Sequence, residues 1–338
     1  MVGPKCKHQQ HLFCISRVKN AAFPNELGLR HTASVFLRES HLNEKLRARL
    51  GLTGPIMVDS GGFALSMNPA LSWSVRHVGN TIEKMRADVF VTLDIPPGST
   101  DSARERERKI VVSVKNYEKL LNRFPKKTIM PVVHGRTRSE LQRSIKLIAA
   151  VLPNPKWVGI GGVVPLLQRR RLLPDWKGSP ESFIAMSIRQ TREEFQRARI
   201  HVFGAGGTRT FPATVALGAD SADSIGWRQA AGFGSVFFPL KSQRILSHAV
   251  DKRPVRKLID KDDLSSLSIC RCPICKRGTS VRARVNTLKA NFHNRAIHNA
   301  WTLAHQFEAW PQSRAELAAS ISSGLLGTDW ALALKEWS

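Results

Sequence analysis

Two aspartates stand where apolar runs of this 338-residue chain give way to small residues. Asp59 is followed by Ser60-Gly-Gly-Phe63, and Asp223 lies within Ala219-Asp-Ser-Ala-Asp-Ser-Ile-Gly226. Carboxylates serve as nucleophiles and as general acids or bases, and glycines let a ligand approach the backbone. We therefore expect the two acids, each at a strand end, to share one active site. An exposed turn aspartate is the alternative for Asp59.

A third acid follows the same pattern. Asp94 ends an apolar run and is followed, after one residue, by two prolines. Its alternative role is that of a helix cap, for which the residues at 99–101 compete. His134-Gly135 and Gly161-Gly162 close two further apolar runs. A single histidine or glycine pair at such a place is a weak signal, so these positions gain weight only in combination.

Three cysteines lie close together in Cys270-Arg-Cys-Pro-Ile-Cys275. Zinc in structural sites takes four ligands in a tetrahedron, and this spacing supplies three thiolates from one turn. A site closed by a fourth protein ligand leaves no open position, so its role is structural. Three unrelated cysteines are the alternative. The segment downstream offers three histidines as the fourth ligand: His293, His298 and His305.

The remaining cysteines carry less information. The chain has five in all, and an odd number argues against a disulfide framework and for a reducing, cytoplasmic location. Cys6 and Cys14 flank His8 and His11, which is one way to build a second metal site. We favour a plain pair of N-terminal strands there.

Apolar runs alternate with amphipathic ones along most of the chain. Strands are expected at 55–59, 89–94, 129–134, 157–161, 200–204 and around Asp223. Helices are expected at 74–86, 103–124, 139–151 and 181–197. Repeated strand–helix–strand order predicts parallel strands joined by helical crossovers, and continuous apolar strands predict a sheet buried on both faces.

A doubly wound sheet and a closed (β/α)₈ (TIM) barrel both satisfy this α/β pattern. The acids, the histidine and the glycine pairs stand at the carboxyl ends of the predicted strands, which is where a barrel carries its active site. We therefore expect the barrel, with N-terminal strands, at 1–240. A zinc-binding subdomain and C-terminal helices packed on the barrel are expected at 241–338. The basic segment Leu166–Pro180, with Arg169, Arg170 and Arg171, is expected to be a loop over the barrel mouth.

The charge of the chain points to a polyanionic partner. Lys and Arg number 52 against 26 Asp and Glu, a formal net charge of +26. Such an excess fits nucleic acid or an anionic membrane surface. No apolar run approaches the roughly 18 residues of a membrane span, and no apolar segment of a secretory signal follows the basic start. Nucleic acid is therefore the expected partner, and a solubilising surface is the alternative.

Taken together, the motifs resemble the tRNA-guanine transglycosylase superfamily. The resemblance is carried by Val58-Asp-Ser-Gly-Gly-Phe63, Thr92-Leu-Asp94, Val133-His-Gly135, Gly159-Ile-Gly-Gly162, Gly218-Ala-Asp-Ser-Ala-Asp223 and the cysteine cluster, in this order over about residues 50 to 300. It implies a (β/α)₈ barrel with a zinc subdomain, in agreement with the pattern of elements. It also implies exchange of a guanine in nucleic acid for a 7-deazaguanine.

The resemblance assigns roles by motif position. Asp223 is implied as the nucleophile that attacks the anomeric carbon, and Asp59 as the acid/base residue. Asp94 is implied to bind the guanine edge, and Phe63 to stack on the base. The other base-contacting positions are Ser60, Gly61, Gly62, His134, Gly161 and Gly162. The implied ligands of a structural Zn²⁺ are Cys270, Cys272, Cys275 and His298, with His293 as the rival histidine.

Departures from the family pattern point to one branch. His134 and Ala64 stand where the tRNA enzymes usually have glutamine, and only Arg228 is basic in the segment Ser224–Ala231 that follows the nucleophile. With the charge, these differences favour the DNA-modifying (DpdA-type) members, which insert 7-cyano-7-deazaguanine into DNA. The target nucleotide would then have to be flipped out of the duplex. Trp227 is either a wedge for that step or a core residue.

Two other functions stay open at this point. A tRNA-guanine transglycosylase of the queuosine or archaeosine type would use the same chemistry on another polyanion. A non-catalytic nucleic-acid-binding subunit is the alternative of another class, and the presence of both Asp59 and Asp223 argues against it. Helper proteins of a DNA-modification system and a homodimer are further expected partners, and no membrane is expected.

Overall fold

The computed structural model describes residues 56–62, 74–98, 100–168, 176–246, 257–306 and 313–337, together with the backbone of two short strands at 12–15 and 34–36. Several residues singled out above lie outside this part of the chain. They are Phe63, Ala64, Ser99 and Arg169–Arg171. The histidines and cysteine proposed near the N-terminus, His8, His11 and Cys6, also lie outside it, and only the backbone of Cys14 is described.

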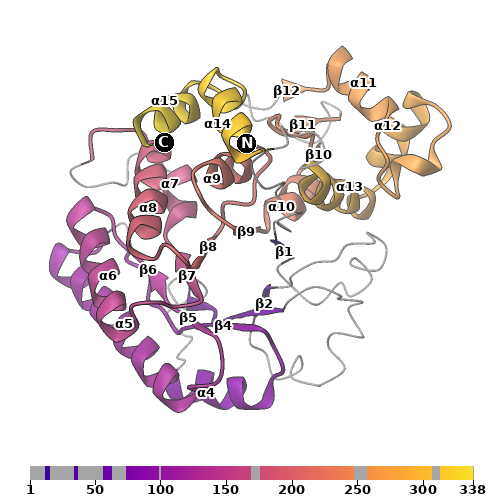
Figure 1. Cartoon of the computed structure of the whole chain (residues 1–338). Coiled ribbons are helices and arrows are strands. Elements are labelled where there is room, and N and C mark those ends of the chain that lie inside the picture. Colours follow the sequence, from indigo (N-terminus) through magenta and orange to yellow (C-terminus); the bar gives the residue numbers. More distant parts are fainter. Residues whose placement is uncertain are drawn as a thin grey trace, which may run out of the picture.

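Parallel strands form a closed ring in the order of the chain (Figure 1). The strands are β1 (Leu12–Ile15), β2 (Ser34–Phe36), β3 (Met57–Asp59), β4 (Val89–Val91), β5 (Ile129–Met130), β6 (Val132–Val133), β7 (Trp157–Ile160), β8 (Arg199–Val202) and β9 (Ser221–Ser224). One sheet runs β2-β3-β4-β5 and the other runs β1-β9-β8-β7-β6.

Two junctions close the ring. β5 and β6 are halves of one predicted strand, interrupted at Pro131, whose backbone has no N–H to donate to a ladder. β1 pairs with β9 on one side and lies next to β2 on the other. This arrangement confirms the predicted (β/α)₈ barrel and excludes the open doubly wound sheet. It also shows that the N-terminal strands belong to the barrel wall.

Side chains alternate between the inside of the barrel and its helical coat. Inward-facing residues form a cluster of their own, made of Met57, Val89, Val91, Met130, Val132 and Trp157, with Phe203 packed against it. Their strand neighbours, such as Val58 and Phe90, pack with the surrounding helices in the main core. The expectation of strands buried on both faces is therefore correct. Because Asp59 lies two residues beyond Met57, it falls on the inner side of the wall.

Helices coat the outside of the ring. They are α4 (Val75–Lys84), α5 (Ala103–Arg123), α6 (Arg138–Val151), α7 (Val163–Gln168), α8 (Pro180–Glu194), α9 (Thr210–Ala216) and α10 (Gly226–Gly232). Hydroxyl side chains cap four of them by accepting a bond from the backbone three residues on: Ser74, Ser102, Thr137 and Ser179. The predicted loop at Leu166–Pro180 is wrong at both ends, since Leu166–Gln168 belong to α7 and Pro180 begins α8. Pro165 is tolerated in α7 because it lies in the first turn of that helix.

A second core joins the end of the barrel to the cysteine segment. It contains β10 (Ser235–Val236), β11 (Arg244–Ile245), β12 (Lys257–Leu258), α11 (Lys261–Ser268), the 3-10 turn η3 (Cys275–Arg277), α12 (Val281–Ala290) and α13 (Phe292–His305). Asn299 links α13 to the segment that follows β9, because its side-chain amide donates to the carbonyls of Trp227 in α10 and Ser235 in β10 and its Oδ1 accepts from the N–H of Phe237. This core begins at Trp227, and the boundary at residue 240 remains a prediction.

The last two helices return to the barrel. α14 (Arg314–Ser322) packs on α9, and α15 (Thr328–Trp337) packs on α8 (Figure 1). The hydroxyl of Ser182 in α8 donates to Glu336 and accepts from the indole N–H of Trp337. Within the described residues, none of the helices has the length and apolar character needed to cross a membrane.

Candidate active site

Asp59 is the last residue of β3. The start of that strand is fixed by the N–H of Ile56, which donates to Asp88 Oδ2 at 2.7 Å. The backbone then turns at Gly61, whose φ of 79° lies in the left-handed region that favours glycine. In this turn the N–H of Gly61 donates to Asp59 Oδ1 at 3.2 Å. The glycine after the strand thus turns the chain back over the carboxylate.

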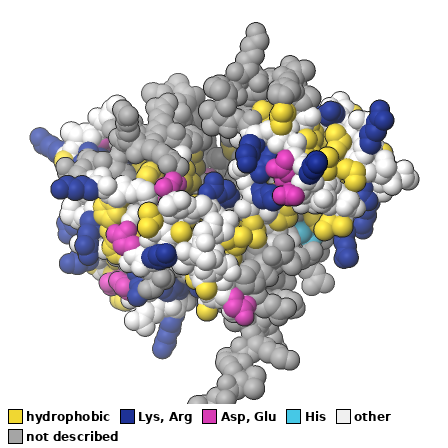
Figure 2. Space-filling view, turned by 90° about the horizontal axis from the view of Figure 1, so that it is seen from above, with side chains coloured by type: hydrophobic (Ala, Val, Ile, Leu, Met, Phe, Trp, Pro, Cys, Tyr) yellow, Lys and Arg dark blue, Asp and Glu magenta, His cyan; other side chains and the backbone are white. Residues whose placement is uncertain are grey.

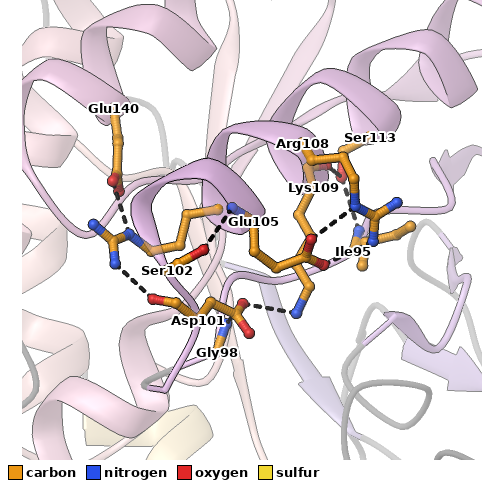
Figure 3. Close-up of polar contacts among 10 residues, drawn as sticks. Ile95, Gly98, Asp101, Ser102, Glu105, Arg108, Lys109, Ser113 and Glu140 are labelled. Carbon is orange, nitrogen blue, oxygen red and sulfur yellow. Dashed lines mark hydrogen bonds and ion pairs between the residues drawn. The ribbon is translucent and has the colours of Figure 1, made fainter.

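The loop after β4 holds Asp94 in place. Asn116 of α5 donates to the carbonyl of Leu93, and the N–H of Ile95 donates to Ser113 Oγ at 2.8 Å. Farther along, Asp101 accepts from the N–H of Gly98 and pairs with Lys109, so the loop is tied to the start of α5 (Figure 3). The cap of α5 is Ser102. Asp94 is therefore not a helix cap.

Asp94 pairs with His134 at the barrel's carboxyl end. His134 Nε2 lies 2.7 Å from Asp94 Oδ2, and both side chains are buried. Since a carboxylate can only accept, His134 donates from Nε2. No described residue hydrogen-bonds His134 Nδ1. One oxygen of Asp94 is thus held by a neighbouring strand, while Oδ1 faces Gly62.

The glycines next to this pair leave room for it. A Cβ on Gly62 would collide with Asp94 Oδ1, and a Cβ on Gly161 would collide with the ring of His134. Gly162 has a φ of 76°, and no atom of the described residues lies within 4 Å of the position that a Cβ would occupy. Gly161 therefore accommodates a side chain of the protein, whereas Gly162 is the position with space for a ligand. The Ser60 side chain is fully buried, and its Oγ has no hydrogen-bond partner among the described residues.

Asp223 projects from β9 toward the end of β8. The N–H of Gly204, where φ is 74°, donates to Asp223 Oδ1 at 2.6 Å. The N–H of Gly206 donates to the Asp223 carbonyl, and a Cβ on Gly206 would lie 2.7 Å from that oxygen. A buried histidine that the sequence analysis did not single out, His201, places Nε2 3.5 Å from Asp223 Oδ1.

The neighbouring acid Asp220 has a different environment. Its Oδ2 accepts from Arg192 at 2.7 Å and from the N–H of Ile200 at 2.8 Å. It stands before β9, whereas Asp223 lies within the strand. Asp220 thus links α8 to the start of the strands. Of the two acids, only Asp223 lies among the residues at the carboxyl end of the barrel.

The surroundings of Asp59 raise its pKa. Burial raises the pKa of Asp59 from 3.8 to about 7, and the negative charges of Asp94 and, less strongly, Asp223 add to this rise. Hydrogen bonds from the backbone of Gly61 and Ser60 oppose it. Like charges disfavour ionisation only when they are close. Asp59 is therefore a carboxyl group able to gain or lose a proton near neutral pH, next to two other acids.

Trp227, which follows the strand of Asp223, is a core residue. Its side chain is buried, and its indole N–H donates to the carbonyl of Ser224 at 3.0 Å. It cannot act as an exposed wedge in this conformation. The exposed apolar side chain nearest to Asp223 in the sequence is that of Ile225.

The cysteine segment forms a compact cluster with one histidine. The sulfur atoms of Cys270, Cys272 and Cys275 and Nδ1 of His298 all lie within 4.8 Å of one another. His298 Nε2 donates to the carbonyl of Phe237 at 3.0 Å, which directs Nδ1 at the sulfurs. The other two candidate histidines are elsewhere, since His293 is exposed and His305 stacks on Trp301.

The chemistry of this cluster fits a metal cation. Burial lowers the pKa of His298, but hydrogen bonds and charges from Cys270 and Cys272 outweigh it and raise the value to about 10. The sulfurs thus attract positive charge to the position that Nδ1 faces. Three sulfurs and one imidazole nitrogen are the ligand set of a closed, four-coordinate zinc site.

Comparison with known proteins agrees with this arrangement. The family model described as queuine tRNA-ribosyltransferase (TGT) matches residues 19–314. A tRNA-guanine(15) transglycosylase of Pyrococcus abyssi is 28% identical over 280 residues, which cover 82% of this chain and 43% of that protein. The enzyme of the same name from Methanopyrus kandleri is 26% identical over 279 residues, covering 82% of this chain and 55% of its own length.

The chain therefore spans about half the length of the curated relatives it matches. The matched region contains the barrel strands from β2 onward, the three acids and the cysteine–histidine cluster. With a family model that covers most of its residues, the chain belongs to the queuine tRNA-ribosyltransferase (TGT) family.

Proposed function

We propose that the chain is a guanine transglycosylase, a pentosyltransferase that exchanges a guanine in nucleic acid for a 7-deazaguanine. The observation that carries this proposal is the placement of Asp59, Asp94 and Asp223 at one end of the barrel, with the pKa of Asp59 raised to about 7. A carboxyl group with such a pKa can both give and take a proton at neutral pH. A non-catalytic subunit would need neither a carboxyl group with a raised pKa nor a second carboxylate fixed beside it.

Asp223 is the nucleophile in this proposal. A carboxylate oxygen of Asp223 attacks C1′ of the target nucleotide, and the C1′–N9 bond breaks with its electron pair going to the guanine. Asp59, as the neutral acid, gives its proton to the departing base. The result is a covalent aspartyl-nucleoside on an unbroken strand. Because the chain's own carboxylate takes part, the route is that of a retaining glycosidase.

In the second half of the proposed reaction, the incoming base reverses the steps of the first half. Asp59, now a carboxylate, removes the proton from the ring nitrogen of the incoming 7-deazaguanine. That nitrogen attacks C1′ and displaces Asp223, which regains its negative charge. Two displacements at C1′ retain the configuration of the sugar. The cycle returns both acids to their starting protonation states, so no external oxidant or metal is consumed.

Asp94 and His134 are proposed to select the base. Asp94 can accept hydrogen bonds from the N1–H and exocyclic amine of guanine, and the His134 contact fixes its orientation. The backbone at Gly162, with no described atom near the position of a Cβ, suits contact with the carbonyl side of the base. The stacking role of Phe63 and the base contacts of Ser60, Gly61 and Gly62 rest on motif position alone.

The first candidate that we propose for the polymer substrate is tRNA. The relatives above are named as tRNA enzymes, which supports tRNA over the DNA expected from the motif departures. The observation that keeps DNA as a second candidate is His134, which replaces the usual glutamine and is bound to Asp94. Both polymers fit the surface in Figure 2, where Lys and Arg side chains stand at both edges of the face, including that of the α11–α13 segment.

Zinc is proposed as the structural ion of Cys270, Cys272, Cys275 and His298. It would cross-link the 3-10 turn to α13, and α13 in turn is bound to α10 and β10 through Asn299. The ion lies in a core separate from the acids and has no part in the exchange. Its contribution is to hold the basic α11–α13 segment in a fixed position beside the barrel.

One experiment tests both the chemistry and the polymer. The purified protein is incubated with tRNA and, separately, with DNA carrying labelled guanine, in the presence of 7-cyano-7-deazaguanine. Release of label and mass analysis of the nucleosides report exchange. We expect exchange in tRNA, and exchange in DNA alone would establish the second candidate. Asp223→Ala should abolish exchange while leaving polymer binding within about twofold, because one neutral substitution alters few of the phosphate contacts. Exchange by that variant would refute the assigned nucleophile.

A further inference from the structure

A buried histidine faces the proposed nucleophile from the neighbouring strand. β8 and β9 are parallel, and His201 lies opposite Ser221 in their register. The His201 side chain is fully buried, with Nδ1 2.8 Å from Ser221 Oγ and Nε2 3.5 Å from Asp223 Oδ1. The ring of Phe203 packs edge-on against the imidazole at 4.5 Å. Strand pairing and packing together leave the imidazole little freedom to turn.

On these contacts, and on the proposed function above, we infer that His201 is a positioning residue for Asp223. It holds Oδ1 of the carboxylate through Nε2–H, so that Oδ2 is the oxygen that bonds to C1′. The role is distinct from proton transfer, which belongs to Asp59. His201 neither touches the base nor carries a proton through the cycle.

The contact with Ser221 is compatible with the tautomer that this role needs. A serine hydroxyl can donate to Nδ1, and the imidazole proton then sits on Nε2. The opposite tautomer would turn the lone pair of Nε2 toward the negative carboxylate, and the two would repel each other. Nε2 has no hydrogen-bond partner among the described residues, and Asp223 Oδ1 lies 3.5 Å from it. By donating to Nδ1, the Ser221 hydroxyl supports this tautomer and so acts on the nucleophile indirectly.

Two nitrogen atoms lie close to the same oxygen of the carboxylate. The N–H of Gly204 donates to Oδ1 at 2.6 Å, and His201 approaches Oδ1 from the adjacent strand position. Among the described residues, none donates a hydrogen bond to Oδ2. The contact of 3.5 Å is longer than a direct hydrogen bond, and such contacts in unliganded sites commonly shorten when substrate binds. One oxygen is held and the other is left to react.

The held oxygen changes character during the cycle. In the free enzyme Oδ1 shares a full negative charge, whereas in the aspartyl-nucleoside it is a neutral ester carbonyl. A hydrogen bond from Nε2–H is stronger to the charged form. It therefore favours the free carboxylate over the ester and assists the step in which the second base displaces Asp223. Without this donor, the covalent intermediate should be more stable relative to the free enzyme.

Two substitutions distinguish the contributions of the two ring nitrogens of His201. His201→Gln places an amide N–H near the position of Nε2, and His201→Asn places one near Nδ1 but does not reach Asp223. We expect His201→Asn to lower kcat about 10- to 100-fold, the effect of losing one hydrogen bond to a charged group, with KM for the base nearly unchanged. His201→Gln should recover most of that loss. The Asn variant should also accumulate about tenfold more covalent intermediate at fixed guanine concentration.

The measurements are steady-state exchange, thermal melting and the fraction of protein that migrates with the polymer on a denaturing gel. Equal kcat in wild type, Gln and Asn variants would overturn the inference and leave the proposed function intact. Equal losses in Gln and Asn, in proportion to lower melting temperatures and with an unchanged covalent fraction, would reduce His201 to a packing residue. If His201→Asn does not fold, Ser221→Ala replaces it and should lower kcat with His201 unaltered. No exchange by the wild type would refute both proposals.

Discussion

Replacing Asp59 by asparagine should stabilise the fold at alkaline pH while it abolishes base exchange. The pKa of Asp59 rises from 3.8 to about 7 because the group is buried and two acids lie near it. The folded protein therefore binds the Asp59 proton more tightly than the unfolded chain does. Below pH 4 both states hold the proton, and this group makes no difference to stability. Between pH 4 and pH 7 the unfolded chain loses the proton first, so the contribution of Asp59 to stability falls as pH rises.

The size of the effect follows from the same pKa. Each tenfold change in acid dissociation corresponds to about 1.4 kcal/mol, so ionising Asp59 in the fold costs up to about 4 kcal/mol more than in the unfolded chain. Asparagine carries no charge at any pH and keeps an oxygen that can accept the Gly61 N–H. The Asn variant should thus be more stable than wild type at pH 8.5 by up to about 4 kcal/mol, and the difference should shrink toward pH 4.

Urea unfolding at a series of pH values measures this difference. The matched control is Asp262→Asn, which removes an exposed acid in the first turn of α11 and should leave the pH dependence nearly unchanged. Parallel curves for wild type and Asp59→Asn across pH 4 to 8.5 would refute the argument, because Asp59 would then titrate alike in both states. Exchange by the Asn variant at the wild-type rate would refute its role in proton transfer.

Three further predictions concern single residues. Cys272→Ser should release the zinc and unfold the α11–α13 segment while the barrel persists, which metal analysis and limited proteolysis would detect; a zinc-free variant that resists proteolysis would contradict it. Gly161→Ala, whose Cβ would collide with the His134 ring, should weaken base binding at least about tenfold in calorimetry, since it displaces the partner of Asp94. Asp220→Asn should lower the free energy of unfolding by about 1 to 3 kcal/mol in urea, with kcat unchanged, because it breaks the Arg192 pair far from the chemistry.

Much of the barrel could be predicted because its strands are short apolar runs that end in polar residues. The residue types at the ends of these runs were enough to predict the carboxyl end of the ring, as at Asp59, Asp94, His134, Gly161 and Asp223. The same rule missed His201, which stands inside an apolar strand. The available signal was that His201 is a single polar residue at an inward-facing position of the strand beside that of Asp223. Reading it required the β8–β9 register, which depends on contacts between residues about 20 positions apart.

Other features depended on contacts that no local pattern contains. Asp94 and His134 lie at two strand ends that are 40 positions apart in the chain. The motifs therefore implied a role for each residue but did not predict the hydrogen bond between them. The choice of His298 over His293 follows from the Phe237 carbonyl, which orients one ring, and from the exposure of the other. A plain pair of strands was expected near Cys6 and Cys14, where β1 lies, and β2 at Ser34–Phe36 was not predicted. Their true partners are β9 and β3, and the first of these is far along the chain.

The pairing of β1 with β9 has a consequence for how the protein is made. The register sets Cys14 opposite Asp223, so the strand that bears the proposed nucleophile is completed by residues synthesised about 200 positions earlier. At about 5 to 20 residues per second, the ribosome needs roughly 10 to 40 seconds between the two strands. During that interval β1 is an unpaired edge, and the ring cannot close. Barrel closure is thus a late event in synthesis, and loss of β1 would impair the strand of the proposed nucleophile without removing any of the proposed catalytic groups.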